Sequence, residues 1–450
     1  MKTEKKLYIV VMLMVLVMLQ PGCNKQNEHR QQNAKTKVEV PKLLTKHHAI
    51  GTPEEQQQTL NTFNALATAI RKDPNDMEAR LKLARIFMQE ARLTGEHGYY
   101  YPAALQVIDE VLESNAKTKD NRFVALLFKG SVLLSLHQFN NALKVGEEAL
   151  QLNQHNALIY GVLVDANVEL GNYQAAVKMA DKMVALRPDL RSYARASYLR
   201  EIHGDVEGAI EAMKLAVSSG YPGLEETAWC RLTLGHLYET YGDLEKAAAQ
   251  YQTALNERPN YPFAMAALAG IAMKKSEYQG AEQLLKKACS IIPEVSFYEQ
   301  LADLYQETGR TKETRQTVEE VFAMLADDEE SGHIMNLEYI QIHLNFTHDY
   351  DKALEYALQE YEARPDNIDV NKELAVIYFK KDNLEEAAKH LQKAMRTNSV
   401  NPELLCVAGL IKIKTGLEKE GRALLTKAMQ SNPYQSHSLR EEARAFLANV

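Results

Sequence analysis

Apolar and small residues recur along this chain in the pattern of two short amphipathic helices joined by a turn. The clearest copy is LTLGHLYETYGDLEKAAAQYQTALNERP, residues 232–259. Leu234 and Tyr238 fall on one face of a first helix, Gly242 interrupts the pattern, and Tyr251 lies on the apolar face of a second helix. This pattern predicts an antiparallel pair of helices, that is, a helical hairpin.

The hairpin pattern returns about every 34 positions, which is the spacing of a repeat solenoid. Each unit of a solenoid packs on its neighbours, so one elongated domain continues for as many units as the chain has. We expect a small residue where the two helices of a unit cross, because close axial approach leaves room only for Gly or Ala. Thr314 is the one position of the series that is neither Ala nor Gly. The other recurring positions are Ala142, Ala176, Ala209, Ala247, Ala281, Ala353, Ala387 and Gly421.

The unit resembles the tetratricopeptide repeat, whose pattern is a large apolar residue, Leu-Gly, Tyr, a Gly-Asp turn, Ala, an aromatic residue, Ala and a closing Pro. Residues 157–189, 368–401 and 402–435 repeat much of this pattern, and with weaker copies elsewhere the resemblance covers most of 77–435. The resemblance implies an all-α fold, a right-handed α-solenoid of about ten stacked antiparallel helix hairpins. It also implies a protein that acts by binding other proteins.

Capping helices and insertions are expected around this solenoid. Residues 53–76 are predicted to cap its N-terminal end with one helix, and residues 436–450 its C-terminal end. The first unit carries TGEHGYYYP at 94–102, which predicts a loop before its second helix. Two intervals between recurring small residues are longer than the usual 34, and their extra residues predict loops near 218–223 and 327–332. The tyrosines of the first insertion either pack beneath it or anchor a partner, since aromatic residues serve as interface anchors.

The N-terminus has the pattern of an export signal. Three lysines precede a 13-residue apolar run, shorter than the roughly 20 residues of a membrane-spanning helix. The run ends on Gly22-Cys23, which resembles the lipobox of bacterial lipoproteins, where the cysteine becomes the lipid-bearing N-terminus. The usual lipobox has Leu at the place of Gln20 and Ala or Ser at that of Pro21. We predict a signal peptide over 1–22 and lipidation of Cys23.

The segment after the predicted signal peptide differs from the solenoid in composition and charge. Residues 23–52 are rich in Gln, Asn and Lys, and predict a lipid-anchored flexible tether. The whole chain has a formal net charge of −8, which argues against general nucleic-acid binding, because that function needs a basic surface. By resemblance to lipoprotein sorting in proteobacteria, Asn24 favours the outer membrane over the inner one.

Motifs for catalysis or cofactor binding do not occur in the sequence. It has no phosphate-binding GxxxxGK[ST], no HExxH and no GxSxG. The cysteines after Cys23 are far apart and form no CxxC pair. The pair His47-His48 lies in the expected tether and is weak evidence for a metal. We therefore expect a protein that is not an enzyme and binds no cofactor or metal.

Tetratricopeptide arrays bind partners in a concave groove lined mainly by first helices, and the repeat register picks out the groove positions. They predict an acidic centre that favours a basic or mixed-charge protein or peptide, with an apolar C-terminal end. The alternative is that the acidic residues only keep the surface soluble. The predicted groove residues are Asp165, Tyr198, Glu201, His236, Glu239, Glu299, Asp303, Glu338 and Phe379.

Two functions are consistent with these patterns, and a third, an enzyme or its subunit, is so only if an associated chain supplies the catalysis. The first is a membrane-anchored scaffold that recruits or assembles partner proteins at the bacterial cell envelope. The second is a lipoprotein for nutrient or glycan uptake, a class that is also built on such repeats. Uptake proteins carry long insertions for ligand binding, whereas the insertions of this chain are short, so we favour the scaffold.

Overall fold

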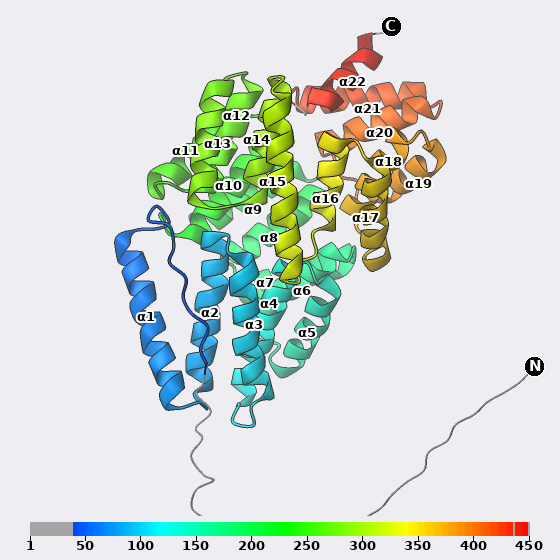
Figure 1. The fold of residues 1–450 in the computed structure, drawn as a ribbon. Coiled ribbons are helices and arrows are strands. Elements are labelled where there is room, and N and C mark those ends of the chain that lie inside the picture. Colours follow the sequence, from blue (N-terminus) through cyan, green and yellow to red (C-terminus); the bar gives the residue numbers. More distant parts are fainter. Residues whose placement is uncertain (1–38, 435–436, 449–450) are drawn as a thin grey trace, which may run out of the picture. The chain divides into compact units, whose positions relative to one another are not determined.

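A computed structural model describes residues 39–434 and 437–448, which form helices joined by short connections and contain no strand (Figure 1). The expected signal peptide over 1–22 and Cys23 lie outside the described residues. The helices from α2 to α21 pair into ten consecutive antiparallel hairpins, as the repeat period predicts.

The first five hairpins are α2 (Met77–Thr94) with α3 (His97–Glu113), α4 (Lys119–Ser135) with α5 (Phe139–Leu152), α6 (Ala157–Glu169) with α7 (Tyr173–Leu186), α8 (Leu190–Ile202) with α9 (Val206–Ser218), and α10 (Glu225–Thr240) with α11 (Leu244–Glu257). The second five are α12 (Pro262–Lys274) with α13 (Tyr278–Ile291), α14 (Val295–Glu307) with α15 (Thr311–Glu330), α16 (Asn336–Ile342) with α17 (Tyr350–Ala363), α18 (Ile368–Lys380) with α19 (Leu384–Ala394), and α20 (Pro402–Lys414) with α21 (Glu418–Ser431). A π-helical turn, η1 (His343–Thr347), follows α16.

Small residues lie at the helix crossings, as the sequence predicts. Ala142, Ala247 and Ala387 are completely buried. In the fifth hairpin, a Cβ atom at Gly235 of α10 would lie 2.2 Å from the Tyr251 ring of α11. The two helices therefore approach too closely for a side chain at this position, and the glycine lets the aromatic ring fill the crossing.

The turn inside each hairpin contains a residue with positive φ, and in four hairpins the side chain of the next residue caps the second helix. In the fifth hairpin, Gly242 has φ +85° and the side chain of Asp243 accepts a hydrogen bond from the backbone N–H of Lys246. A positive φ ends the first helix, and the carboxylate caps the free N–H groups of the second. The Gly-Asp pair thus sets the antiparallel return of the chain.

The extra residues of the two longer repeat intervals have different structures. The first falls in a loop between α9 and α10, as predicted. The second lengthens α15, whose 20 residues end at Glu330, so most of 327–332 is helix and not loop. The helix can continue through this acidic stretch, because no glycine or proline interrupts it before Gly332.

The tyrosines of the first insertion lie in α3, because the helix begins at His97 and includes most of the expected loop 94–102. Tyr100 is fully buried, and its hydroxyl accepts a hydrogen bond from Leu44 N at 3.0 Å. The Tyr99 hydroxyl bonds both the N–H and the carbonyl of Lys42 at 2.9 Å. Two of the three tyrosines therefore hold the segment that precedes α1.

That segment corrects the expectation of a flexible tether over all of 23–52. From Val40 to Gly51 the chain runs along the solenoid, with Val40 and Ile50 buried and Lys46 paired to Glu90 at 2.8 Å. An extended strand-like segment needs partners for its backbone groups, and the tyrosine hydroxyls supply some of them. The part of the tether before residue 39 lies outside the described residues.

Single helices cover both ends of the stack. At the start, α1 (Pro53–Lys72) packs on α2 through Phe63, Ala67 and Ile70. At the other end, α22 (His437–Ala448) contacts α20 and α21, and Ala443 is completely buried. Both helices close an apolar end that a terminal repeat would otherwise expose.

Distant hairpins meet along a line that we call the seam (Figure 1). The turn between α4 and α5 reaches the loop after α15, where Ile334 N donates to Leu136 O at 3.2 Å. The end of α6 reaches the end of α17, where Arg364 pairs with Glu169 at 2.5 Å. Asn432, after α21, donates to the carbonyls at the end of α10. The stack therefore curves far enough for later hairpins to rest on earlier ones.

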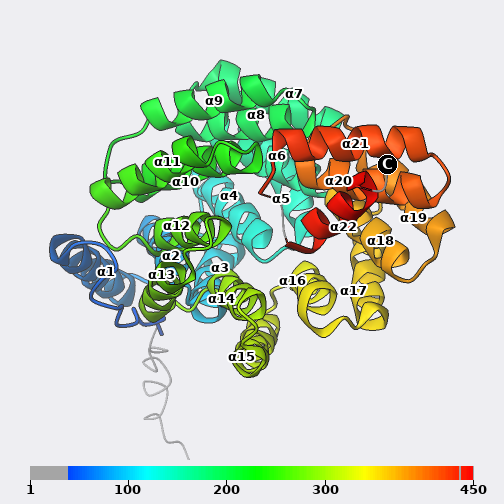
Figure 2. The same ribbon diagram turned by 90° about the horizontal axis from the view of Figure 1, so that it is seen from above.

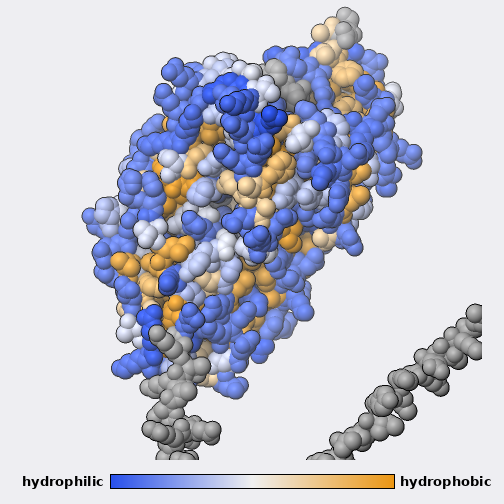
Figure 3. Space-filling model, viewed as in Figure 1, coloured by the Kyte–Doolittle hydropathy of each residue, from blue (hydrophilic) through white to orange (hydrophobic). Residues whose placement is uncertain are grey.

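The surface seen in Figure 3 is largely hydrophilic, with apolar residues in separate strips. Among the described helices, none is both long and apolar enough to cross a membrane.

Candidate functional site

The first helices of the hairpins line the inner side of the stack. Each first helix from α2 to α12 contacts the next first helix along the chain, and α18 contacts α20. Figure 2 shows α8, α12, α14 and α18 nearer the middle of the view than their second helices. This closer approach of one set of helices makes their side concave. All nine predicted groove residues lie on first helices, on α6, α8, α10, α14, α16 and α18.

Asp165 is already paired within the protein. Arg195, on the next first helix, donates from Nε and Nη2 to its two carboxylate oxygens at 2.8 and 2.5 Å. Such a bidentate pair satisfies both partners. Asp165 is therefore better explained as a link between the third and fourth hairpins than as a contact for a partner.

His236 and Glu239 also belong to an internal network. Glu239 accepts hydrogen bonds from the Tyr251 hydroxyl at 2.7 Å and from Lys274 Nζ at 2.5 Å. His236 Nδ1 lies 3.0 Å from the same hydroxyl. Although burial opposes ionisation, hydrogen bonds from His236, Lys274 and Tyr251 and the charge of Lys274 lower the pKa of Glu239 to about 2. This carboxylate stabilises the fifth hairpin and its contact with the sixth.

Tyr198 and Glu201 of α8 lie near α18 across the seam. Burial, followed by the charge of Asp369, raises the pKa of Glu201 to about 7. The same two causes raise the pKa of Tyr198 well above its usual value, although 40% of this side chain is accessible to water. Protein surrounds these side chains without covering them, which is the environment of a concave surface.

Glu299, Asp303 and Glu338 form what we call the acidic cluster. Oε1 of Glu299 and Oε2 of Glu338 are buried and have no hydrogen-bond partner in the described part of the protein. Buried polar atoms are rarely left unpaired in folded proteins. The cluster is thus the part of the predicted groove whose charges are least compensated by the protein itself.

The acidic cluster is electrostatically strained. Burial, then the charges of Glu338, Asp303 and Glu294, raises the pKa of Glu299 to about 8. Water reaches Asp303, but the surrounding protein partly desolvates it and, with Glu307, raises its pKa to about 7. Burial also raises the pKa of Glu338. Like charges in a partly dry environment oppose one another's ionisation, and a cation placed among them would relieve this.

Phe379, at the C-terminal end of the predicted groove, is half-buried and packs against the apolar clusters of α18 to α21. The ammonium of Lys380 lies 6.0 Å from the centre of its ring. Phe379 therefore contributes mainly to the core, with part of its ring left accessible on the first-helix side.

Glu294 joins the acidic cluster but was not among the predicted residues. It directly precedes α14, and burial, then the charges of Asp328 and Glu338, raises its pKa to about 7. The repeat register selects positions inside first helices, so a residue in the connection before the helix is overlooked. A run of acidic residues beginning just before a first helix is the signal that would have found it.

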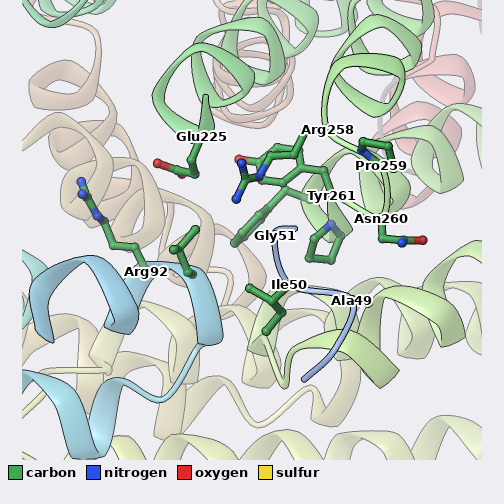
Figure 4. Close-up of a pocket in the computed structure, with 12 residues that line it drawn as sticks. Ala49, Ile50, Gly51, Arg92, Glu225, Arg258, Pro259, Asn260 and Tyr261 are labelled. Atoms are coloured by element: carbon green, nitrogen blue, oxygen red, sulfur yellow. The ribbon is translucent and has the colours of Figure 1, made fainter. Parts of the chain in front are cut away.

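A small cavity lies between the segment before α1 and the loop from α11 to α12 (Figure 4). Its volume is about 20 Å³, and Ile50, Gly51, Arg92, Glu225 and Tyr261 are among its lining residues. A space of this size holds about one water molecule and excludes a sugar or nucleotide. The cavity is a packing feature of the docked segment.

Parts of the chain are similar to a known family of repeats. Models described as tetratricopeptide repeat match residues 133–200 in one case, and 232–295 and 346–402 in another. No curated protein matches the sequence.

Several solved structures have similar helix arrangements. The thermophilic tetratricopeptide protein TTC0263 of Thermus thermophilus is 22% identical, covers 44% of this chain and 99% of its own, and gives a TM-score of 0.38. The structure of pilF of Pseudomonas aeruginosa is 15% identical, covers 48% of this chain and 98% of its own, and gives a TM-score of 0.38. Human IFIT1, solved as a dimer with m7Gppp-AAAA, is 13% identical, covers 84% of this chain and 87% of its own, and gives a TM-score of 0.45.

The family matches fall in three separate parts of a chain that folds into ten helical hairpins with small residues at their crossings. These three parts of the chain contain tetratricopeptide repeats.

Proposed function

We propose that this protein is a membrane-anchored scaffold of the bacterial cell envelope that binds a basic or mixed-charge segment of a partner protein on its acidic cluster. Tetratricopeptide repeats suggest a protein–protein interaction scaffold, typically without catalysis of its own. The observation that carries the choice of partner is the pair of buried, unpartnered carboxylate oxygens of Glu299 and Glu338 on the concave side. Lysine or arginine side chains would supply the missing hydrogen bonds and compensate the charge.

Neutralising the acidic cluster is expected to abolish binding of a basic segment. The variant combines Glu299→Gln, Asp303→Asn and Glu338→Gln, which keep the side-chain size. Fluorescence anisotropy would measure binding of a labelled Lys/Ala peptide, with a Glu/Ala peptide as the negative probe. We expect the affinity for the basic peptide to fall by about 10-fold or more, because several charge-assisted hydrogen bonds of about 1.5–3 kcal/mol each are removed.

A matched control separates the cluster from the general acidity of the protein. Glu319→Gln, Glu320→Gln and Glu330→Gln change three exposed residues of α15, with the same change in formal net charge when all three carboxylates are ionised at pH 8.5. Equal loss of binding in both triple variants would show that only overall charge attracts the peptide. Mass spectrometry of proteins retained from envelope membranes would then name the partner, and retention of glycans instead would support the uptake alternative.

Binding is also expected to strengthen as the pH rises. The pKa values of Glu299 and Asp303, about 8 and about 7, exceed their ordinary values, so the free protein holds protons there near neutral pH. A cationic segment favours the ionised carboxylates and displaces these protons. The anisotropy titration should therefore give tighter binding at pH 8.5 than at pH 6, with a much smaller change in the neutralised triple variant.

We also propose that Cys23 carries the lipid anchor and that the protein is exported, more favourably to the outer than to the inner membrane. This rests on the lysines, the apolar run and Gly22-Cys23. Expression with a palmitate analogue should label the wild type and leave Cys23→Ala unlabelled, with membrane fractionation locating the product. An unlabelled wild type would refute the anchor without affecting the acidic cluster.

A further inference from the structure

Two histidines and an aspartate from distant parts of the chain meet at the seam. His97 is the first residue of α3, Asp328 lies near the end of α15, and His333 follows in the loop after that helix. One ligand atom from each lies within 4.8 Å of the other two. Contacts between α3 and α15 hold the two sides together (Figure 1).

His333 points to a missing ligand in this group. The residue is only 8% exposed, and neither ring nitrogen makes a hydrogen bond of normal geometry in the described part of the protein, although the backbone of Ser135 lies near the ring. An imidazole has one donor and one acceptor to satisfy, and leaving both unmade in a buried site is unfavourable. Apolar packing alone does not require a histidine here, whereas an ion bound to the unprotonated ring nitrogen would satisfy its acceptor.

The surroundings restrain the ligands. The ring of His97 stacks on Tyr101, with centroids 5.3 Å apart. His137, in the turn after α4, has its ring centroid 4.6 Å from that of His333, and its Nδ1 lies 2.8 Å from the carbonyl oxygen of Ile334. A hydrogen bond of this kind fixes the tautomer and leaves Nε2 available beside the group.

We propose that His97, Asp328 and His333 bind a transition-metal ion of the zinc class, which joins the first hairpin to the seventh across the seam. Two imidazoles and one carboxylate suit Zn²⁺, whereas Mg²⁺ and Ca²⁺ prefer oxygen ligands alone. Tetrahedral Zn²⁺ places its donor atoms about 3.3 Å apart, so the side chains close by at most about 1.5 Å on binding. Water or His137 completes the coordination.

Zinc titration of the full chain tests this site. The protein would be prepared without a histidine tag, in mild detergent and after treatment with EDTA. Calorimetry should show one tightly bound Zn²⁺ per chain, and Zn²⁺ should raise the melting temperature. Replacing one ligand, in His333→Gln or Asp328→Asn, should weaken binding more than about tenfold, since even loss of a residue that orients a ligand weakens metal binding about 10–100-fold. The visible absorption of bound Co²⁺ should show the same dependence.

Control variants keep the assignment open to refutation. His155→Gln changes an exposed histidine in another loop, and a His47→Gln/His48→Gln double variant removes the adjacent pair before α1. Both should bind Zn²⁺ like the wild type. His97→Gln, at a half-exposed position, provides a ligand variant if His333→Gln fails to fold. Undiminished Zn²⁺ binding in folded His97→Gln, or its loss in the His47/His48 variant, would overturn the proposal.

Discussion

Arg364→Met is expected to lower the free energy of unfolding by about 3–5 kcal/mol, because it leaves a buried carboxylate without its cation. The Arg364 side chain is 4% exposed and pairs at 2.5 Å with Glu360, which is 6% exposed, and with Glu169 across the seam. Its guanidinium also lies 4.8 Å from the centre of the Phe139 ring. One side chain therefore joins α17 to α5 and α6.

Urea denaturation followed by circular dichroism would measure this loss. Lys82→Met is the control, because it breaks an ion pair with Glu78 whose side chains are 59% and 75% exposed, and exposed pairs contribute about 0–1 kcal/mol. A second variant, Arg364→Met with Glu360→Met, removes the stranded charge and should recover much of the stability. If Arg364→Met is no worse than Lys82→Met, the seam does not contribute to stability through this ion pair.

Gly171→Ala is expected to destabilise the protein by about 2–5 kcal/mol, the sum of backbone strain and a clash across the seam. Gly171 has φ +78°, and a Cβ atom there would lie 2.3 Å from the carbonyl oxygen of Asp366. The carbonyl belongs to backbone and has little freedom to move. The Arg396 guanidinium, which donates to the carbonyls of both Gly171 and Asp366, would be displaced as well.

Gly309→Ala isolates the strain from the clash. Gly309 occupies the equivalent turn of another hairpin with φ +71°, but no atom lies within 4 Å of the position of a Cβ. This variant should lose only the about 1–2 kcal/mol that a left-handed conformation costs a residue with a side chain. The difference between the two variants, measured by the same denaturation, is the contribution of seam contact at Gly171. Equal losses would mean that the seam opens readily at this point.

The seam also matters for the proposed functions. It places Asp369 of α18 close enough to raise the pKa of Glu201 on α8, and it brings His97 to His333. A variant that opened the seam would separate these groups while leaving each hairpin intact. We therefore expect opening of the seam to separate the metal ligands, whereas Glu299 and Asp303 share α14 and stay together.

The predicted groove residues show what the repeat register can and cannot predict. It placed all nine predicted residues on first helices, because one period sets the face of every unit. It did not separate carboxylates already paired from those left free. Asp165 is neutralised by Arg195 and Glu239 by Lys274, each on the next first helix, whereas Glu299 has no such cation among residues that the structure describes. A search for a cation about one period further along would have made this distinction.

From the sequence alone follow the hairpins, their number, the small residues at their crossings and the groove face, because these depend on contacts within a unit or between neighbours. The docking of Val40 to Gly51, the Arg364 network and the meeting of His97 with His333 were decided by the tertiary structure. Each unit turns slightly relative to the last, and this rotation accumulates over many units. Which distant loops meet depends on that sum, and no local pattern encodes it.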